Sequence, residues 1–147
     1  MEKLREKLRV TNEPTELDIP LVHRFLSEES AWARGIPLAT VEESIRHSLN
    51  FGLFSGPAQV AYARVVTDYA TFAYLVDVFV LAEHRGKGYS AELMAAVMEH
   101  PRLKGLRRFM LATSTAHGLY AKFGFTAPLK PQALMECFAP DVYANGS

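Results

Sequence analysis

The stretch that decides the fold is Val76-Asp77-Val78-Phe79-Val80-Leu81-Ala82-Glu83-His84-Arg85-Gly86-Lys87-Gly88-Tyr89-Ser90-Ala91. It begins as an apolar, β-branched run, passes through a basic turn with two glycines, and continues from Tyr89 with apolar residues at helical spacing. This pattern predicts a strand, a tight turn and a helix start. N–H groups in the first turn of a helix have no partner inside the helix, so such a junction attracts phosphate. Arg85 and Lys87 add positive charge there, although two glycines could also simply close a tight connection.

The composition is that of an ordinary globular protein. The chain has 147 residues, with 49% hydrophobic and 22% charged residues, and we expect one domain, 1–147. Sixteen basic and sixteen acidic residues cancel, which argues against a nucleic-acid partner. The single cysteine, Cys137, cannot form an internal disulfide, which favours the cytoplasm, and no stretch is long enough for a membrane span. The histidines show no paired metal spacing, so we expect no metal.

Two helices and a run of strands are predicted before the turn. A strand is expected at residues 8–11, although Leu4 and Leu8 are also spaced for a helix. The other expected elements are a helix at 19–27 capped by Asp18, a helix that begins at the cap Thr40 with Glu43 in the capping-box position, and strands at 51–54, 59–66 and 71–81. Short turns join the three later strands, so we expect an antiparallel meander.

A parallel strand and a short helix are predicted after the turn. The helix at 89–99 leads to a strand at 107–112, and a strand–helix–strand connection makes that strand parallel to its predecessor. Thr115 is expected to cap a short helix that Gly124 ends. Phe125 and residues 133–138 are predicted to form a final pair of strands, with Cys137 buried among them.

Two other kinds of phosphate-binding loop have spacings close to that of the glycine turn. A Walker-type loop would need glycine at Leu81 and Ser or Thr at Gly88, so it fails twice. Gly86-Lys87-Gly88-Tyr89-Ser90-Ala91 does fit the dinucleotide pattern G-x-G-x-x-A. That motif also needs an acidic residue at the end of the next strand, where the chain has Leu111-Ala112-Thr113-Ser114. A nucleotide-binding domain is therefore the weaker alternative.

Two segments resemble the GNAT N-acetyltransferases. Residues 85–90 are similar to the R-x-x-G-x-G/A acetyl-CoA pyrophosphate motif of that family, with Ser90 in place of its last small residue. Ala116-His117-Gly118-Leu119-Tyr120-Ala121-Lys122-Phe123-Gly124-Phe125 resembles the family's A-x-x-L-Y-x-K-x-G-F segment. The resemblance covers residues 51–125. Thr113 departs from the family, because many members carry Asn there.

The resemblance implies a fold and a cofactor site. The fold is α+β in three α/β/α layers, with a mixed, mostly antiparallel sheet and a V-shaped split between strands 4 and 5. Acetyl-CoA would lie in the V, and no metal is implied. The residues that would contact it are Val78, Phe79 and Val80 along the pantetheine arm, Arg85, Gly86, Lys87, Gly88, Tyr89 and Ser90 around the pyrophosphate, and Thr113 beyond the fifth strand.

Acetyl transfer to an amine needs a proton donor for the leaving thiolate and a neutral amine. Tyr120 matches the family tyrosine that serves as the acid, although its helical neighbours also suit a core aromatic. Asp77 interrupts an apolar strand, so its carboxylate is expected either to act as the base or to be satisfied by hydrogen bonds.

The acceptor amine, of a small molecule or a peptide, is expected to meet residues around the irregular segment 28–37. The candidates are Phe25, Trp32, Arg34, Tyr74 and His117. A homodimer is common among the proteins that the chain resembles. The alternative to an enzyme is a CoA-binding regulatory module without turnover.

Overall fold

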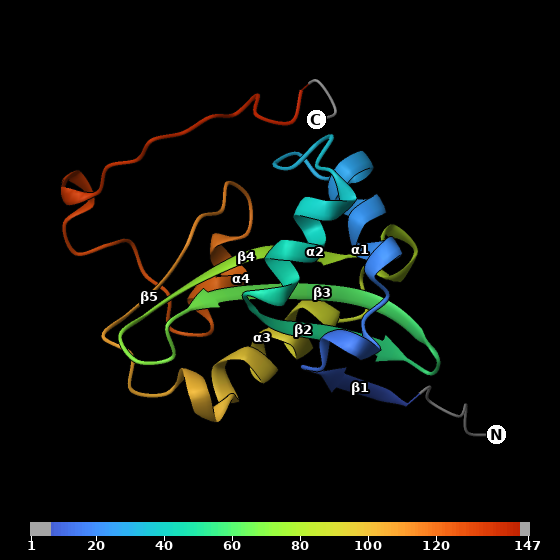
Figure 1. The fold of residues 1–147 in the computed structure, drawn as a ribbon. Coiled ribbons are helices and arrows are strands. Elements are labelled where there is room, and N and C mark those ends of the chain that lie inside the picture. The colour runs from blue at the N-terminus through green and yellow to red at the C-terminus, as the bar shows by residue number, and fades with distance from the viewer. Residues whose placement is uncertain (1–6, 145–147) are drawn as a thin grey trace.

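A five-stranded sheet forms the centre of the molecule, which is described here from a computed structural model that covers residues 7–144 (Figure 1). The strands lie in the order β1-β2-β3-β4-β5. The strands are β1 (Leu8–Thr11), β2 (Leu49–Ser55), β3 (Ala58–Thr67), β4 (Phe72–Val80) and β5 (Arg108–Leu111), and the helices are α1 (Ile19–Arg24), α2 (Leu38–Arg46), α3 (Tyr89–Glu99) and α4 (His117–Ala121).

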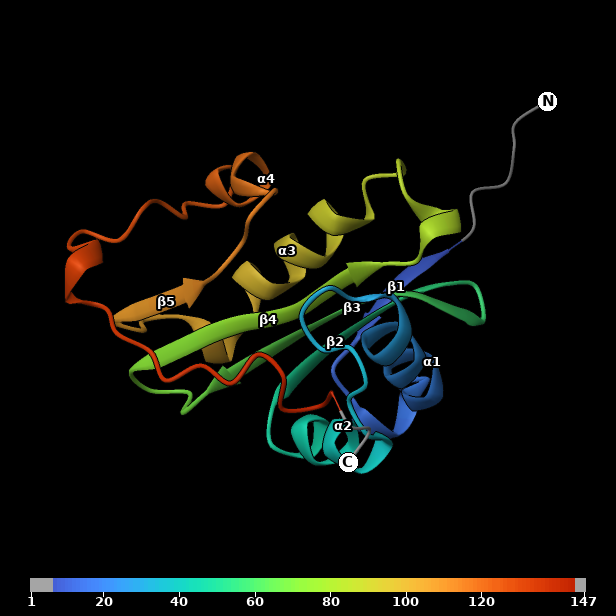
Figure 2. The same cartoon turned by 90° about the horizontal axis from the view of Figure 1, so that it is seen from above.

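Strand pairing confirms the predicted topology. β1 to β4 pair antiparallel in chain order, and β5 pairs parallel with β4 after the crossover through α3. The helices α1 and α2 cover one face of the sheet, and α3 covers the other (Figure 2). The three-layer α+β fold that the resemblance implies is therefore confirmed.

Each face of the sheet has its own hydrophobic core. On the α3 side, Leu93, Met94 and Val97 of the helix are fully buried against inward side chains of β2, β3 and β4. On the α1 and α2 side, Tyr62 and Phe79 are the sheet residues of the cluster. Burial of this apolar surface is the main force that holds the layers together.

The predicted start of helix α1 is confirmed, and that of α2 is wrong. Asp18 caps α1 by accepting a hydrogen bond from the Leu21 N–H, and the helix continues as a π-helical turn over Phe25–Glu29. Helix α2 begins at Leu38, not after Thr40, and no side chain caps it. Pro37 takes the N-cap position with an extended backbone, and its carbonyl accepts the Thr40 N–H, so Thr40 already lies inside the helix.

The predicted cap of α4 and the final strands are also wrong. Ala116 is the N-cap of α4, where Thr115 was expected. Within residues 126–144 the only regular element is a 3-10 turn, Pro131–Ala133, so neither Phe125 nor 133–138 forms a strand. Cys137 is exposed. Prolines at 128, 131 and 140 cannot donate to a ladder, and the segment lies on no strand edge of its own chain.

In the part of the chain that the structure describes, no helix is both long and apolar enough to cross a membrane.

Candidate active site

The sheet splits between β4 and β5. The two strands pair from Phe72 with Arg108 to Leu75 with Leu111, and pairing stops there although β4 continues to Val80. The predicted V-shaped split is thus confirmed. The edge of β4 from residue 76 to residue 80 is left without a strand on the β5 side, which leaves backbone groups open to an extended ligand.

A β-bulge in β4 lies where the split opens. Arg64 pairs with Val76 and Tyr62 with Phe79, so β4 carries one more residue than β3 over this interval. Asp77 has φ 57°, in the left-handed region that Asp tolerates better than most residues. The bulge directs the Asp77 side chain to the α1 and α2 side, where its contacts lie.

The glycine turn presents open backbone to solvent. Gly86 and Gly88 have φ 79° and 80°, and a Cβ built on either would meet nothing within 4 Å. Gly88 is the N-cap of α3, and no side chain caps the helix. The first N–H groups of this eleven-residue helix therefore have no side-chain cap, which leaves them available to an anion.

A hollow of about 140 Å³ lies over this turn and is lined by Val80, His84, Arg85, Gly86, Gly88, Tyr89 and Ser90. The Arg85 Nε donates to the Val80 carbonyl at 3.1 Å, which ties the basic turn to the open end of β4. The His84 ring stacks on Tyr89 with centroids 6.4 Å apart. The His84 Nδ1 is buried and has no hydrogen-bond partner among residues 7–144, a group that a polar ligand could satisfy.

Tyr120 and Thr113 lie on the β5 side of the split. Tyr120 is buried on α4 and packs edge-on against Phe125, with centroids 6.2 Å apart. Burial raises the pKa of the Tyr120 phenol above its ordinary value, so the group keeps its proton at neutral pH. The Thr113 hydroxyl accepts the Ala116 N–H at 3.0 Å and so supports the start of α4.

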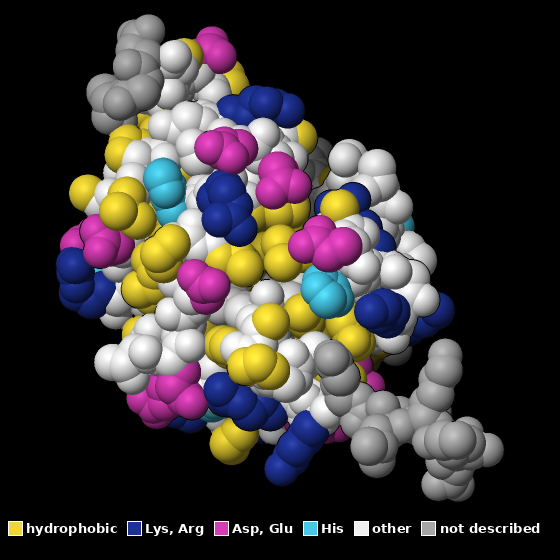
Figure 3. Space-filling view, turned by 90° about the vertical axis from the view of Figure 1, so that its right-hand side faces the viewer, with side chains coloured by type: hydrophobic (Ala, Val, Ile, Leu, Met, Phe, Trp, Pro, Cys, Tyr) yellow, Lys and Arg dark blue, Asp and Glu magenta, His cyan; other side chains and the backbone are white. Residues whose placement is uncertain are grey.

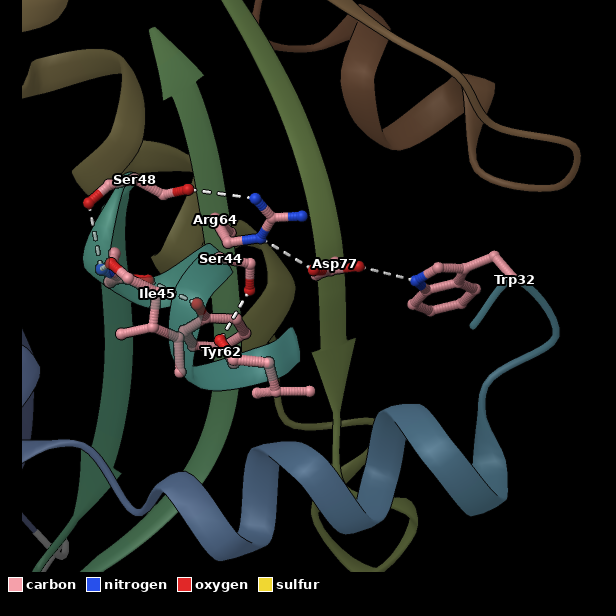
Figure 4. Close-up of polar contacts among 9 residues, drawn as sticks. Trp32, Ser44, Ile45, Ser48, Tyr62, Arg64 and Asp77 are labelled. Carbon is pink, nitrogen blue, oxygen red and sulfur yellow. Dashed lines mark hydrogen bonds and ion pairs between the residues drawn. The ribbon is translucent and has the colours of Figure 1, made fainter. Parts of the chain in front are cut away.

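A polar chain crosses the α1 and α2 side of the sheet (Figure 4). The Asp77 Oδ1 accepts the indole N–H of Trp32 at 2.8 Å, and its Oδ2 accepts the Arg64 Nε–H at 2.9 Å. Arg64 in turn donates to the Ser48 hydroxyl at 3.0 Å. Asp77 is 8% exposed, so the ion pair with Arg64 satisfies a carboxylate that would otherwise be costly to bury. The irregular loop that holds Trp32 is thereby tied to two strands.

The structure brings together some of the predicted acceptor residues. Phe25 stacks on Phe79 with centroids 4.0 Å apart and lies 6.4 Å from the Trp32 ring. Phe25 is buried beside Trp32, whose side chain is half exposed. Arg34 shares a hollow with Trp32; the hollow is completed by Ala31, Pro140, Asp141, Tyr143 and Ala144.

Tyr74 and His117 lie apart from that group. Tyr74 is half-buried on β4, between Val66 of β3 and Met110 of β5. His117 is exposed at the first residue of α4, one helical turn before Tyr120. Both residues therefore belong to the strands and the helix that border the split, and not to the loop that carries Trp32.

Sequence reasoning missed Arg64 and His84. Arg64 is the only charged residue of β3, and its counterpart Asp77 is the only one of β4, a signal that a pair crosses the two strands. His84 directly precedes the basic turn, and a histidine beside a phosphate motif could have been included among the candidates.

Charge is mixed on the face of the molecule that is drawn in Figure 3. On the face drawn in Figure 3, acidic and basic side chains surround a central group of hydrophobic ones, without a broad patch of one sign. Among residues 7–144, no group of three or more His, Cys, Asp or Glu side chains is placed to hold a metal ion.

Known proteins are similar to this chain in sequence or in fold. A curated protein of Gibberella zeae, provisionally named an acetyltransferase, is 31% identical over 135 residues, which cover 77% of this chain and 75% of the relative. A crystal structure from Xanthomonas campestris pv. campestris, provisionally assigned as a GNAT acetyltransferase, is 60% identical with a TM-score of 0.93, covering 96% of this chain and 99% of that one. The ribosomal-protein-S18-alanine N-acetyltransferase of Escherichia coli, 20% identical, has the same fold with a TM-score of 0.66, covering 82% and 78%.

The family model of the GNAT acetyltransferases matches residues 19–125, a range that contains α1, the strands β2 to β5, the glycine turn and Tyr120. This match and the relatives together show that the chain belongs to the GNAT acetyltransferase family.

Proposed function

We propose that this acetyltransferase moves an acetyl group from acetyl-CoA to an amine of a small molecule or a peptide. Two neighbouring features carry the proposal. The open edge of β4 ends at Val80, and the uncapped turn of Gly86 and Gly88 comes after the short 3-10 helix Ala82–His84, where Arg85 holds it to the Val80 carbonyl. The first suits an extended amide-containing arm, and the second suits a pyrophosphate. Acetyl-CoA combines these two chemistries in one ligand.

The transfer is a direct displacement. The amine nitrogen attacks the thioester carbonyl and forms the N–C bond, and the C–S bond breaks. The CoA thiolate takes a proton from the protein, and the amine loses its proton to solvent water. We assign the donated proton to the Tyr120 phenol, which burial keeps protonated. The phenol regains its proton from solvent after the step.

Asp77 is proposed as a positioning residue. Both of its carboxylate oxygens accept hydrogen bonds, from Trp32 and from Arg64, which supports a role in holding the acceptor side of the site. Trp32 and Arg34 would then face the acceptor, with Tyr74 and His117 reaching it from the split. If Asp77 is instead the base, Asp77→Asn will abolish turnover while acetyl-CoA binding is retained.

The cofactor assignment is tested by ligand-induced thermal stabilisation with acetyl-CoA, CoA and NAD. Gly86→Ala is expected to weaken the stabilisation by acetyl-CoA at least tenfold in apparent Kd, because the methyl group enters the space over the turn. Gly105→Ala is the matched control, because Gly105 has φ 76° and equally open surroundings but lies away from the site. Equal effects of both variants, or stabilisation by NAD and not by CoA, would refute the assignment.

The acid is tested by Tyr120→Phe in a thiol-release assay over a panel of amines. The variant is expected to lower kcat by a factor of about 10²–10³ while acetyl-CoA binding is retained, because it removes only the proton donor. Tyr69→Phe, a half-buried tyrosine at another turn, is the control. An unchanged kcat would exclude Tyr120 as the acid, and saturable CoA binding without turnover on any amine would favour a regulatory module.

A further inference from the structure

The hollow that Trp32 and Arg34 line is the larger of the two hollows described above. It lies between the loop at residues 30–36 and residues 140–144, which return beside that loop (Figures 1 and 2). Its volume is about 350 Å³, against about 140 Å³ for the hollow over the glycine turn. Small-molecule sites in proteins have volumes of about 300–1,000 Å³. The hollow is therefore large enough for a small organic ligand.

The loop that forms one wall of the hollow is held by hydrogen bonds of its own. The Ser30 N–H donates to the Phe25 carbonyl at 2.9 Å, and the Ser30 hydroxyl accepts the Ala33 N–H at 3.0 Å. Ala33 is buried, whereas Trp32 and Arg34 on either side of it are exposed. The wall that carries these two side chains is therefore organised before a ligand binds, which lowers the entropy cost of binding.

The opposite wall is fixed to the same part of the molecule. Tyr143 packs against the core under α1 and α2, and its carbonyl oxygen lies within 2.6 Å of where a Cβ on Gly35 would be. The Ala144 N–H donates to the Asp141 carbonyl at 3.0 Å, which closes a turn around Tyr143. The contact between Tyr143 and Gly35 therefore sets the separation of the two walls.

One cation and one anion line the hollow without pairing. Arg34 and Asp141 are both exposed, and within residues 7–144 neither side chain makes an ion pair. The guanidinium fork of an arginine matches a carboxylate, and an aspartate matches an ammonium group. A free α-amino acid carries both of these groups on one carbon, whereas a residue inside a peptide carries neither. The two charges therefore favour a free amino acid as the ligand.

An amine held by Asp141 is not the amine that reacts. A neighbouring carboxylate favours the protonated form of an amine, and an ammonium group has no free electron pair with which to attack the thioester. The reacting amine must therefore be a second one, on the side chain of the amino acid. Trp32 indicates its direction, because the indole lines the hollow and also donates to Asp77, where the split opens (Figure 4).

We propose that the hollow binds the head group of a free diamino acid, with Arg34 on the α-carboxylate and Asp141 on the α-ammonium group, and that the side-chain amine is the acetyl acceptor. This inference rests on the acetyl transfer proposed above. The side-chain amine loses its proton to solvent water and forms the N–C bond, while the C–S bond of acetyl-CoA breaks and the thiolate takes the proton of Tyr120. The product is the amino acid acetylated on its side chain, with the head group unchanged.

The first test is binding to the protein without acetyl-CoA, followed by the fluorescence of Trp32, the single tryptophan, and by titration calorimetry. The probes are lysine and ornithine. Three analogues of lysine are compared with them: ε-aminocaproate lacks the α-amine, cadaverine lacks the carboxylate, and Nα-acetyl-lysinamide lacks both charges. A diamino acid is expected to bind about tenfold more tightly than each analogue, because a charge-assisted hydrogen bond is lost in each case. No saturable signal by either method, or equal binding of Nα-acetyl-lysinamide, would overturn the proposal.

The second test pairs each charge of the ligand with the side chain assigned to it. Arg34→Gln is expected to weaken the binding of lysine and ε-aminocaproate about tenfold and to leave cadaverine unchanged. Asp141→Asn is expected to weaken lysine and cadaverine and to leave ε-aminocaproate unchanged. Arg24→Gln, at an exposed arginine of α1 that does not line the hollow, is the matched control and should change none of them. If either variant weakens ligands with and without the matching charge equally, the proposal fails.

The third test locates the acetyl group by fragmentation mass spectrometry after incubation with acetyl-CoA. Acetylation of the side-chain nitrogen is expected, and acetylation of the α-nitrogen would overturn the proposed orientation. Binding of the diamino acid without acetyl transfer to any amine would refute the proposed function and leave the assignment of the head group standing. Acetyl transfer to cadaverine and to lysine with equal kcat/KM would instead refute the role of the hollow and leave the proposed function standing.

Discussion

Replacement of Asp77 by Asn is expected to destabilise the protein through the loss of one charge. Removing one partner of a buried ion pair costs about 3–5 kcal/mol. The Arg64 and Asp77 side chains keep 16% and 8% of their surface exposed, and Arg64 retains Ser48 as a partner. We therefore expect a loss below that range, about 2–3 kcal/mol in the free energy of unfolding.

The choice of Asn separates charge from backbone strain. Asn tolerates the left-handed φ of 57° and keeps an oxygen that can accept the Trp32 N–H, so mainly the ion pair is lost. Asp77→Ala should lose about 1–2 kcal/mol more, because alanine does not favour that backbone conformation. The double variant Arg64→Met with Asp77→Asn should recover part of the loss, because no charge is then left unpaired.

The measurement is urea unfolding followed by the fluorescence of Trp32, the single tryptophan. The midpoint is expected to fall while the denaturant slope is unchanged. Glu43→Gln is the control, because Glu43 pairs with Arg46 and hydrogen-bonds to His47 on the surface, where such contacts contribute little. If Asp77→Asn shifts the midpoint no more than Glu43→Gln does, the ion pair does not stabilise the fold and the argument is refuted.

Two further predictions concern the stability of the protein in acid and the contact between Tyr143 and Gly35. Burial and the nearby Arg102 lower the pKa of His100, so the unfolded chain binds more protons below about pH 6.5 and stability should decline as the pH falls. His100→Asn keeps an acceptor for the Arg102 N–H and should flatten the fall in Tm between about pH 7 and pH 5; an equally steep fall would exclude His100 as its source. Gly35→Ala should lower the free energy of unfolding by more than the strain alone, about 1–2 kcal/mol, because its methyl group meets the Tyr143 carbonyl. Gly105→Ala is the control, because Gly105 has a similar positive φ in open surroundings, so its loss of stability measures the backbone strain alone. Equal losses in the two variants would mean that the backbone at Tyr143 moves away at no cost.

The sequence correctly predicted the elements whose signals lie within the element itself or next to it in the chain. Helix α3 spans Tyr89–Glu99 as expected, because its glycine N-cap, apolar periodicity and terminal proline all act within the segment. Residues 133–138 have a comparable strand pattern but need an adjacent edge, and none of their own chain reaches them. Strand propensity expresses packing against neighbours, so the pattern alone could not decide the outcome.

The site could be predicted where a motif is contiguous and not where a bulge sets the geometry. The turn of Gly86 and Gly88 is a sequence feature, and the structure places it at the N-terminus of α3. The contact of Asp77 with Arg64 depends on one extra residue in β4, which alternation along a strand does not reveal. Without the bulge, Asp77 would point to the α3 side, as its neighbour Val78 does.

The bulge accounts for two features of the site. A bulge bends its strand and increases the local twist, and pairing between β4 and β5 ends at Leu75, two residues before Asp77. The bend therefore helps to separate the strands and to open the edge that we assign to the cofactor. The same extra residue turns Asp77 toward Trp32 and fixes the acceptor side. A deletion that restored regular pairing between β3 and β4 would thus be expected to impair both binding sites together, whereas Asp77→Gly, which keeps the bulge, should affect the acceptor side alone.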